Sequence, residues 1–96
     1  MEKEKIKILK MAIEKWGKNA QILMALEEMA ELSKELLKNI NRNSDNKSNI
    51  TEEMADVYIM LEQLKTIYKI SEDDINNIFK EKINKLEKRL KNKENI

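Results

Sequence analysis

Two short acidic segments carry the residue types in this chain that could do chemistry. Segment 27–31 reads Glu-Glu-Met-Ala-Glu, and segment 53–56 reads Glu-Met-Ala-Asp. Each contains two acids spaced three residues apart, so on a helix they project from neighbouring positions. The acids with this spacing are Glu28, Glu31, Glu53 and Asp56. If the two helices pack side by side, these carboxylates converge, and a divalent cation would relieve their mutual repulsion.

Glu53 stands in an apolar setting. At about 100° per residue, one face of its helix is apolar, and the residues of that face are Ile50, Val57, Met60, Leu61, Leu64 and Tyr68. Glu53 falls inside this face and Asp56 lies at its border. Burying an ionised carboxylate costs several kcal/mol unless it is paired or binds a metal. The sequence therefore predicts either a partner for Glu53 or a bound cation.

The composition limits what such a site could be. The chain of 96 residues has no cysteine and no histidine, which excludes thiolate chemistry, a disulfide framework and histidine-zinc sites. A metal here must accept oxygen ligands, as magnesium, manganese and calcium do. The net charge of +1 gives no drive towards nucleic acid or membrane. No apolar run is long enough to span a bilayer and no signal segment is recognisable, so we expect a cytoplasmic protein.

The elements that must position the acids are helices. One glycine and no proline indicate few interruptions. Gly17 is the natural break, segment 41–48 is polar and rich in turn formers, and Asn49 and Ser71 are candidate N-caps. Apolar spacing then predicts four helices, at residues 3–16, 18–41, 50–69 and 72–92.

These helices predict a single compact all-α domain, a four-helix bundle spanning residues 1–96. We expect the fourth helix to bury a seam formed by Ile75, Phe79, Ile83, Leu86 and Leu90. Trp16 continues the stripe of the first helix and is expected to be a buried anchor. A domain of this size buries only a modest core, which favours association with a second copy.

A plainer interpretation of the acids is a solvated face. Acids in lysine-rich helices usually form exposed i,i+4 ion pairs. Two clusters on consecutive helices, with Glu53 inside an apolar stripe, favour a site. Glu35 and Glu52 are expected to face solvent or to lie behind the ligands.

The spacing E-E-x-x-E, about twenty residues, then E-x-x-D resembles the MazG-like family of all-α nucleoside triphosphate pyrophosphohydrolases. Segments 15–21 and 57–64 are similar to short phage- or prophage-type members, so the resemblance covers residues from about 13 to 69. It implies a MazG-like helical bundle that works as a dimer or a dimer of dimers. It also implies hydrolysis of a nucleoside triphosphate, often a deoxynucleotide, to the monophosphate and pyrophosphate, cleansing the nucleotide pool.

Carried over by position, the resemblance implies that Glu28, Glu31, Glu53 and Asp56 hold Mg²⁺, with Mn²⁺ as a possible substitute. Glu27 is the less certain ligand. Phosphoryl transfer needs positioning and charge neutralisation more than a covalent nucleophile, so the missing histidine and cysteine do not count against it. A carboxylate would take the proton of the attacking water, and the candidates are Glu27 and Glu31.

A triphosphate also needs positive charge from the protein. Lys82, Lys85 and Arg89 share a helix face and could reach phosphates, as could Lys38; the alternative is a solubilising lysine face. Trp16 could also stack on a base, and Asn19 and Gln21 could bind a base edge or serve only in capping and solvation.

Two other functions remain open. The chain could be a catalytically inactive dimerisation or adaptor module whose acids form ordinary salt bridges. It could also be a nucleotide-binding regulator that keeps the metal site without turnover. A lysine buried against Glu53 would favour the adaptor.

Overall fold

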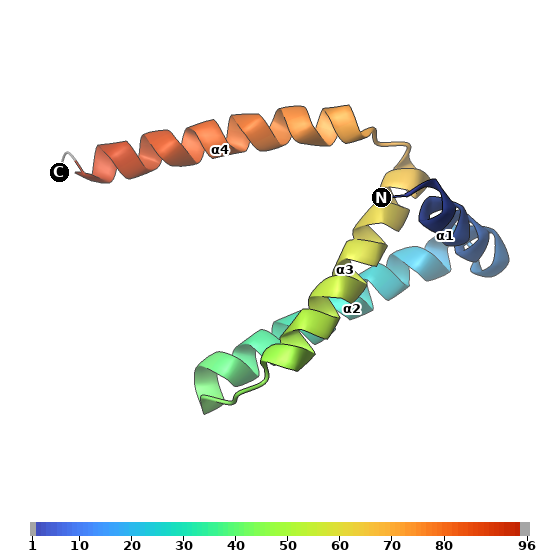
Figure 1. Cartoon of the computed structure of the whole chain (residues 1–96), viewed down its shortest axis with the longest axis horizontal. Helices are drawn as coiled ribbons and strands as arrows, with labels where there is room; N and C mark the ends of the chain where they lie inside the picture. The colour runs from blue at the N-terminus through green and yellow to red at the C-terminus, as the bar shows by residue number, and fades with distance from the viewer. Residues whose placement is uncertain (1, 95–96) are drawn as a thin grey trace.

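The computed structural model describes residues 2–94, and within them it contains four helices and no strand. The helices are α1 (Lys3–Trp16), α2 (Lys18–Arg42), α3 (Lys47–Tyr68) and α4 (Glu72–Glu94) (Figure 1). The predicted all-α class is confirmed. The predicted starts of α1, α2 and α4 are also correct, whereas α3 begins three residues earlier than the predicted residue 50.

Two local signals account for where helices begin and end. Gly17 separates α1 from α2 with φ of 93°, a conformation that favours glycine, and its N–H donates to the carbonyl of Ile13 at 2.8 Å. Ser71 precedes α4, and its Oγ accepts a hydrogen bond from the Asp74 N–H at 3.0 Å. The helix break predicted at Gly17 and the N-cap predicted at Ser71 are therefore both found in the structure.

The packed part of the molecule is an antiparallel hairpin of α2 and α3, with α1 against both near the end where α2 begins (Figure 1). α4 leaves the end of α3 and projects away, and in the described residues it packs on no other helix. An ion pair from Lys65 of α3 to Glu72 holds its first turn. None of the helices in residues 2–94, α4 included, is both long and apolar enough to cross a membrane.

Two burial predictions are wrong for the single chain. The predicted seam of α4 is exposed by 39–62%, at Ile75, Phe79, Ile83, Leu86 and Leu90. Trp16 is also exposed rather than an anchor between helices, and Lys15 Nζ lies 5.3 Å from its ring centroid. The apolar pattern is correct as a helix pattern, but no helix within residues 2–94 covers it.

The chain exposes much more surface than a compact domain of its mass. Its accessible surface is 8228 Å², whereas about 5,800 Å² is expected for a monomer of 11.4 kDa. Its radius of gyration is 17.1 Å, against about 12.5 Å for a compact domain of this length. Among the side chains described, the buried apolar ones are only Ala25 and Met60. One copy alone therefore has a very small fully buried core.

Candidate metal centre

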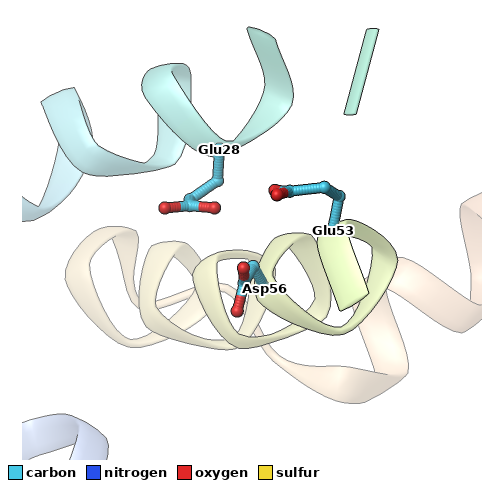
Figure 2. A group of neighbouring side chains, drawn as sticks. All are labelled: Glu28, Glu53 and Asp56. Carbon is cyan, nitrogen blue, oxygen red and sulfur yellow. The ribbon is translucent and has the colours of Figure 1, made fainter. Parts of the chain in front are cut away.

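Three acids from two helices meet at the interface between α2 and α3. Glu28, Glu53 and Asp56 each offer a carboxylate oxygen, and these oxygens all lie within 4.8 Å of one another. Figure 2 shows Glu28 and Glu53 pointing towards each other from α2 and α3, with Asp56 about one turn further along α3. The structure thus brings together three of the four carboxylates predicted as metal ligands. Glu31 is exposed and lies outside this group.

The hairpin geometry explains why these acids converge. On α3, Glu53 and the buried Met60 are seven residues apart, which is close to two helical turns, so they share a face. On α2, the buried Ala25 and Glu28 are three residues apart and share the opposing face. The acids therefore occupy the same contact layer as the small core.

Glu53 is the acid with the least compensation. Its Oε2 is buried and has no hydrogen-bond partner. Burial raises the pKa of Glu53 above its usual 4.5, and the charges of Asp56 and Glu31 raise it further. Burial also raises the pKa of Glu28, with further contributions from Asp56 and Glu53. The uncompensated negative charge can be relieved by protons or by a cation.

A second polar cluster, around Glu35, holds the loop end of the hairpin together. Asn46 Nδ2 donates to the Glu35 carbonyl at 2.8 Å and to its Oε1 at 3.1 Å, and Lys38 Nζ donates to Oε2 at 3.1 Å. Hydrogen bonds from Asn46 first and Lys38 second lower the pKa of Glu35. Glu35 is buried and lies outside the group of three acids, so of the two placements predicted for it the solvent-facing one is wrong.

This second cluster also changes the interpretation of Lys38. Its predicted role was phosphate binding, but in the structure its ammonium is held by Glu35. Asn46 was not singled out from the sequence because it lies in a stretch of turn formers, where one more asparagine carries no signal. The contact joins residues eleven apart across a loop, so only the folded hairpin reveals it.

The predicted substrate-binding residues are not gathered around the acids. Lys82, Lys85 and Arg89 are exposed on α4, which does not pack on the hairpin. Trp16 and Asn19 are exposed on either side of Gly17. The candidate base Glu27 is exposed beside Glu28. The single chain therefore presents the acids without the cations predicted to accompany them.

Two glutamines in the packed helices are buried, which the sequence interpretation did not predict. Gln21 of α2 and Gln63 of α3 are each 3% exposed, and Gln63 Oε1 has no hydrogen-bond partner. Gln21 was predicted to bind a base edge or to be solvated, but its burial leaves it closed to solvent. The burial of Gln63 could have been inferred from its position between Met60 and Leu64, two residues of the apolar face of its helix.

Comparisons of this chain with protein-family models, with curated proteins and with solved structures gave no match. Evidence on function therefore comes from the acidic motifs and from the geometry of the α2–α3 interface.

Proposed function

We propose that this chain is a magnesium-dependent nucleoside triphosphate pyrophosphohydrolase that converts a ribo- or deoxyribonucleoside triphosphate to the monophosphate and pyrophosphate. The observation that carries the proposal is the convergence of Glu28, Glu53 and Asp56, with Glu53 Oε2 buried and lacking a partner. The resemblance of the two acidic motifs to MazG-like enzymes supplies the reaction class.

The donor set fits a hard divalent cation. Carboxylate oxygens are the ligands that Mg²⁺ prefers, and Mn²⁺ accepts the same ones. Glu28, Glu53 and Asp56 would hold the ion, and Glu31 is close enough for its charge to raise the pKa of Glu53. When bound, the ion would supply positive charge against the triphosphate. In the described part of the chain no lysine pairs with Glu53, which favours this role over that of an adaptor.

The exposed acids Glu27 and Glu31 have a different role from the metal ligands. Glu27 and Glu31 lie near the half-buried carboxylates and are open to solvent in one copy, so either can accept the proton of an attacking water. Lys82, Lys85 and Arg89 would bind the phosphates. Because α4 stands apart from the hairpin, we propose that a homodimer or homotetramer brings the α4 cations of one copy to the acids of another.

The deciding experiment is pyrophosphate release from a panel of ribo- and deoxyribonucleoside triphosphates, with and without Mg²⁺. We expect metal-dependent release of pyrophosphate rather than orthophosphate. Glu53→Gln should lower the rate by at least about 100-fold. The change removes a ligand of the metal ion, and a bound metal ion stabilises the transition state by several kcal/mol. Glu52→Gln, an exposed neighbour on the same helix, is the matched control and should retain activity.

Further variants and a binding measurement separate the alternatives. Lys82→Ala with Arg89→Ala should raise KM at least about tenfold, since each charge-assisted hydrogen bond contributes roughly 1.5–3 kcal/mol. Mg²⁺ binding without turnover on any nucleotide would indicate a regulator. Absence of both turnover and Mg²⁺ binding in folded protein would refute the hydrolase and favour a helical association module, whose supporting observation is the exposed seam of α4.

A further inference from the structure

The outer face of α2 carries a regular exposed stripe that the proposed activity does not use. It consists of Leu23, Leu26, Ala30, Ser33, Leu37 and Ile40. All six are exposed, the four large ones by 57–75%. Their spacing alternates between three and four residues, which is the seam of a coiled coil. We call this set the α2 seam.

The α2 seam points away from the rest of the hairpin. At about 100° per residue, its centre lies roughly 150° around α2 from the side that carries the buried Gln21, Ala25 and Glu35. A shallow hollow of about 530 Å³ lies along this side of α2, and Ala30, Ser33 and Leu37 are among its lining residues. Nothing within residues 2–94 covers the seam, so it is free to receive another chain.

The order of side-chain sizes along the α2 seam suits a two-fold partner. Two large residues are followed by two small ones and then by two large ones. In an antiparallel pair, Leu26 faces Leu37 of the second copy, and Ala30 faces Ser33 at the centre, where the backbones approach closely. The ends of the seam match as well, because Leu23 then faces Ile40 of the second copy.

Flanking charges select the antiparallel direction. Glu27 and Lys34 are exposed on the same flank of the α2 seam, at equivalent heptad positions. In an antiparallel pair, residues at this position face each other, so Glu27 lies near Lys34 of the partner subunit, and the two-fold axis repeats this contact. In a parallel pair, Glu27 and Lys34 would face the other flank, which carries Ile22, Met29 and Leu36. Only the antiparallel pair satisfies both charges.

A second copy of α2 also suits the seam better than α4 does. Residues 80–91 of α4 contain six lysine or arginine residues and two glutamates. The hollow along α2 is lined by Lys34, Lys38 and Arg42, so α4 would bring like charges together there. The α2 seam spans about 26 Å of helix, at ~1.5 Å per residue, enough for a continuous apolar contact.

We propose that two copies of this chain associate through their α2 seams as an antiparallel, two-fold pair centred between Ala30 and Ser33. The pair covers apolar surface that one copy leaves exposed, and it places Lys34 of each copy next to Glu27 of the other, which leaves Glu31 as the exposed acid open to the proposed activity. This association does not depend on the proposed hydrolase activity, because it needs neither metal nor nucleotide.

Charge reversal in the full chain tests the contact. The molecular mass is measured by sedimentation without metal or nucleotide, and helical content by circular dichroism. Glu27→Lys and Lys34→Glu should each weaken dimerisation at least about tenfold, because like charges then face each other twice. The double variant should restore it. Glu14→Lys with Lys7→Glu, an exposed pair on α1, is the matched control and should leave dimerisation unchanged.

Cross-linking tests the direction, since the chain has no cysteine of its own. A mixture of Ala30→Cys and Ser33→Cys chains under mild oxidation should give the mixed disulfide dimer, while each variant alone gives little. Efficient cross-linking of each variant with itself would indicate a parallel pair and overturn the proposal. A folded monomer at micromolar concentration would also overturn the proposal. Association that is lost in Ile83→Asp but kept in Leu26→Asp would overturn it too, because it would assign the contact to α4.

Discussion

The α2–α3 hairpin and α4 are made of similar residues but stand in opposite situations. Both are amphipathic and rich in lysine and glutamate. The hairpin has a partner for each of its helices, and its interface holds Ala25, Met60 and a set of polar groups. α4 has an equally regular apolar face, yet in the described residues it packs on no other helix. Amphipathic periodicity thus specifies a helix without specifying what will cover it.

The comparison also shows where the hairpin places its polar groups. Glu35 and Asn46 satisfy each other at the loop end, whereas Glu53 Oε2 has no hydrogen-bond partner in the middle. A buried polar group without a partner is costly, so such groups are rare unless a ligand or function accounts for them. The contrast within one interface separates an acid that stabilises the hairpin from an acid available to a cation.

The largest expected difference between the two regions is in amide hydrogen exchange. A helix without tertiary contacts is marginally stable in water, whereas opening the hairpin must break its interface. In monomeric protein without nucleotide, amides in the middle of α4 should exchange at least about 100-fold faster than those in the middle of α3. Exchange measured by NMR or mass spectrometry decides this. Equal protection of the two helices would contradict the separation of α4 from the hairpin.

The next largest effect should come from Asn46→Ala. The change removes both hydrogen bonds that Asn46 donates to Glu35 and leaves a buried carboxylate less compensated. We expect a loss of about 2 kcal/mol in the free energy of unfolding, or roughly 8–16 °C in Tm for a domain of this size. Thermal unfolding followed by circular dichroism measures it. The control is Asn41→Ala, an exposed position on α2 where little change is expected. An equal loss of unfolding free energy in this control would show that the bonds from Asn46 to Glu35 are not the cause.

The smallest effect is the pH dependence of stability at Glu53. Because the folded-state pKa of Glu53 is raised above 4.5, its ionised form opposes folding. This penalty is full above the raised pKa and disappears as pH falls towards 4.5. Glu53→Gln should therefore raise Tm in metal-free protein at pH 8, and the gain should shrink as pH approaches 4.5. Paired melts with Glu52→Gln as the control test this, and a gain that does not depend on pH would contradict it.

Local features of the fold were predictable from the sequence. Gly17 and Ser71 mark helix boundaries through their own backbone and side-chain chemistry, which acts over a few residues. The third helix was placed too late because Asn49 matched an N-cap pattern. In the structure Asn46 precedes the helix, and its side chain bonds to Glu35 instead of capping. A contact between two helices decided this boundary, and local propensity cannot report such a contact.

The candidate site was predictable to a similar degree. Glu28, Glu53 and Asp56 could be placed on facing helices because spacing of three or four residues fixes a helix face. The burial of Glu35 and the exposure of Trp16 could not be predicted in the same way. Both depend on the crossing of α1, α2 and α3, for which the sequence pattern leaves several solutions.

The bond between Asn46 and Glu35 also bears on the order of folding. It closes a loop of only eleven residues, so the entropy lost on closure is small and the hairpin can form early. The same closure pairs α2 with α3, the two helices that carry Glu28, Glu53 and Asp56. The candidate metal centre therefore needs only the pairing of α2 with α3 for its three acids to meet, because α4 packs on no other helix in residues 2–94.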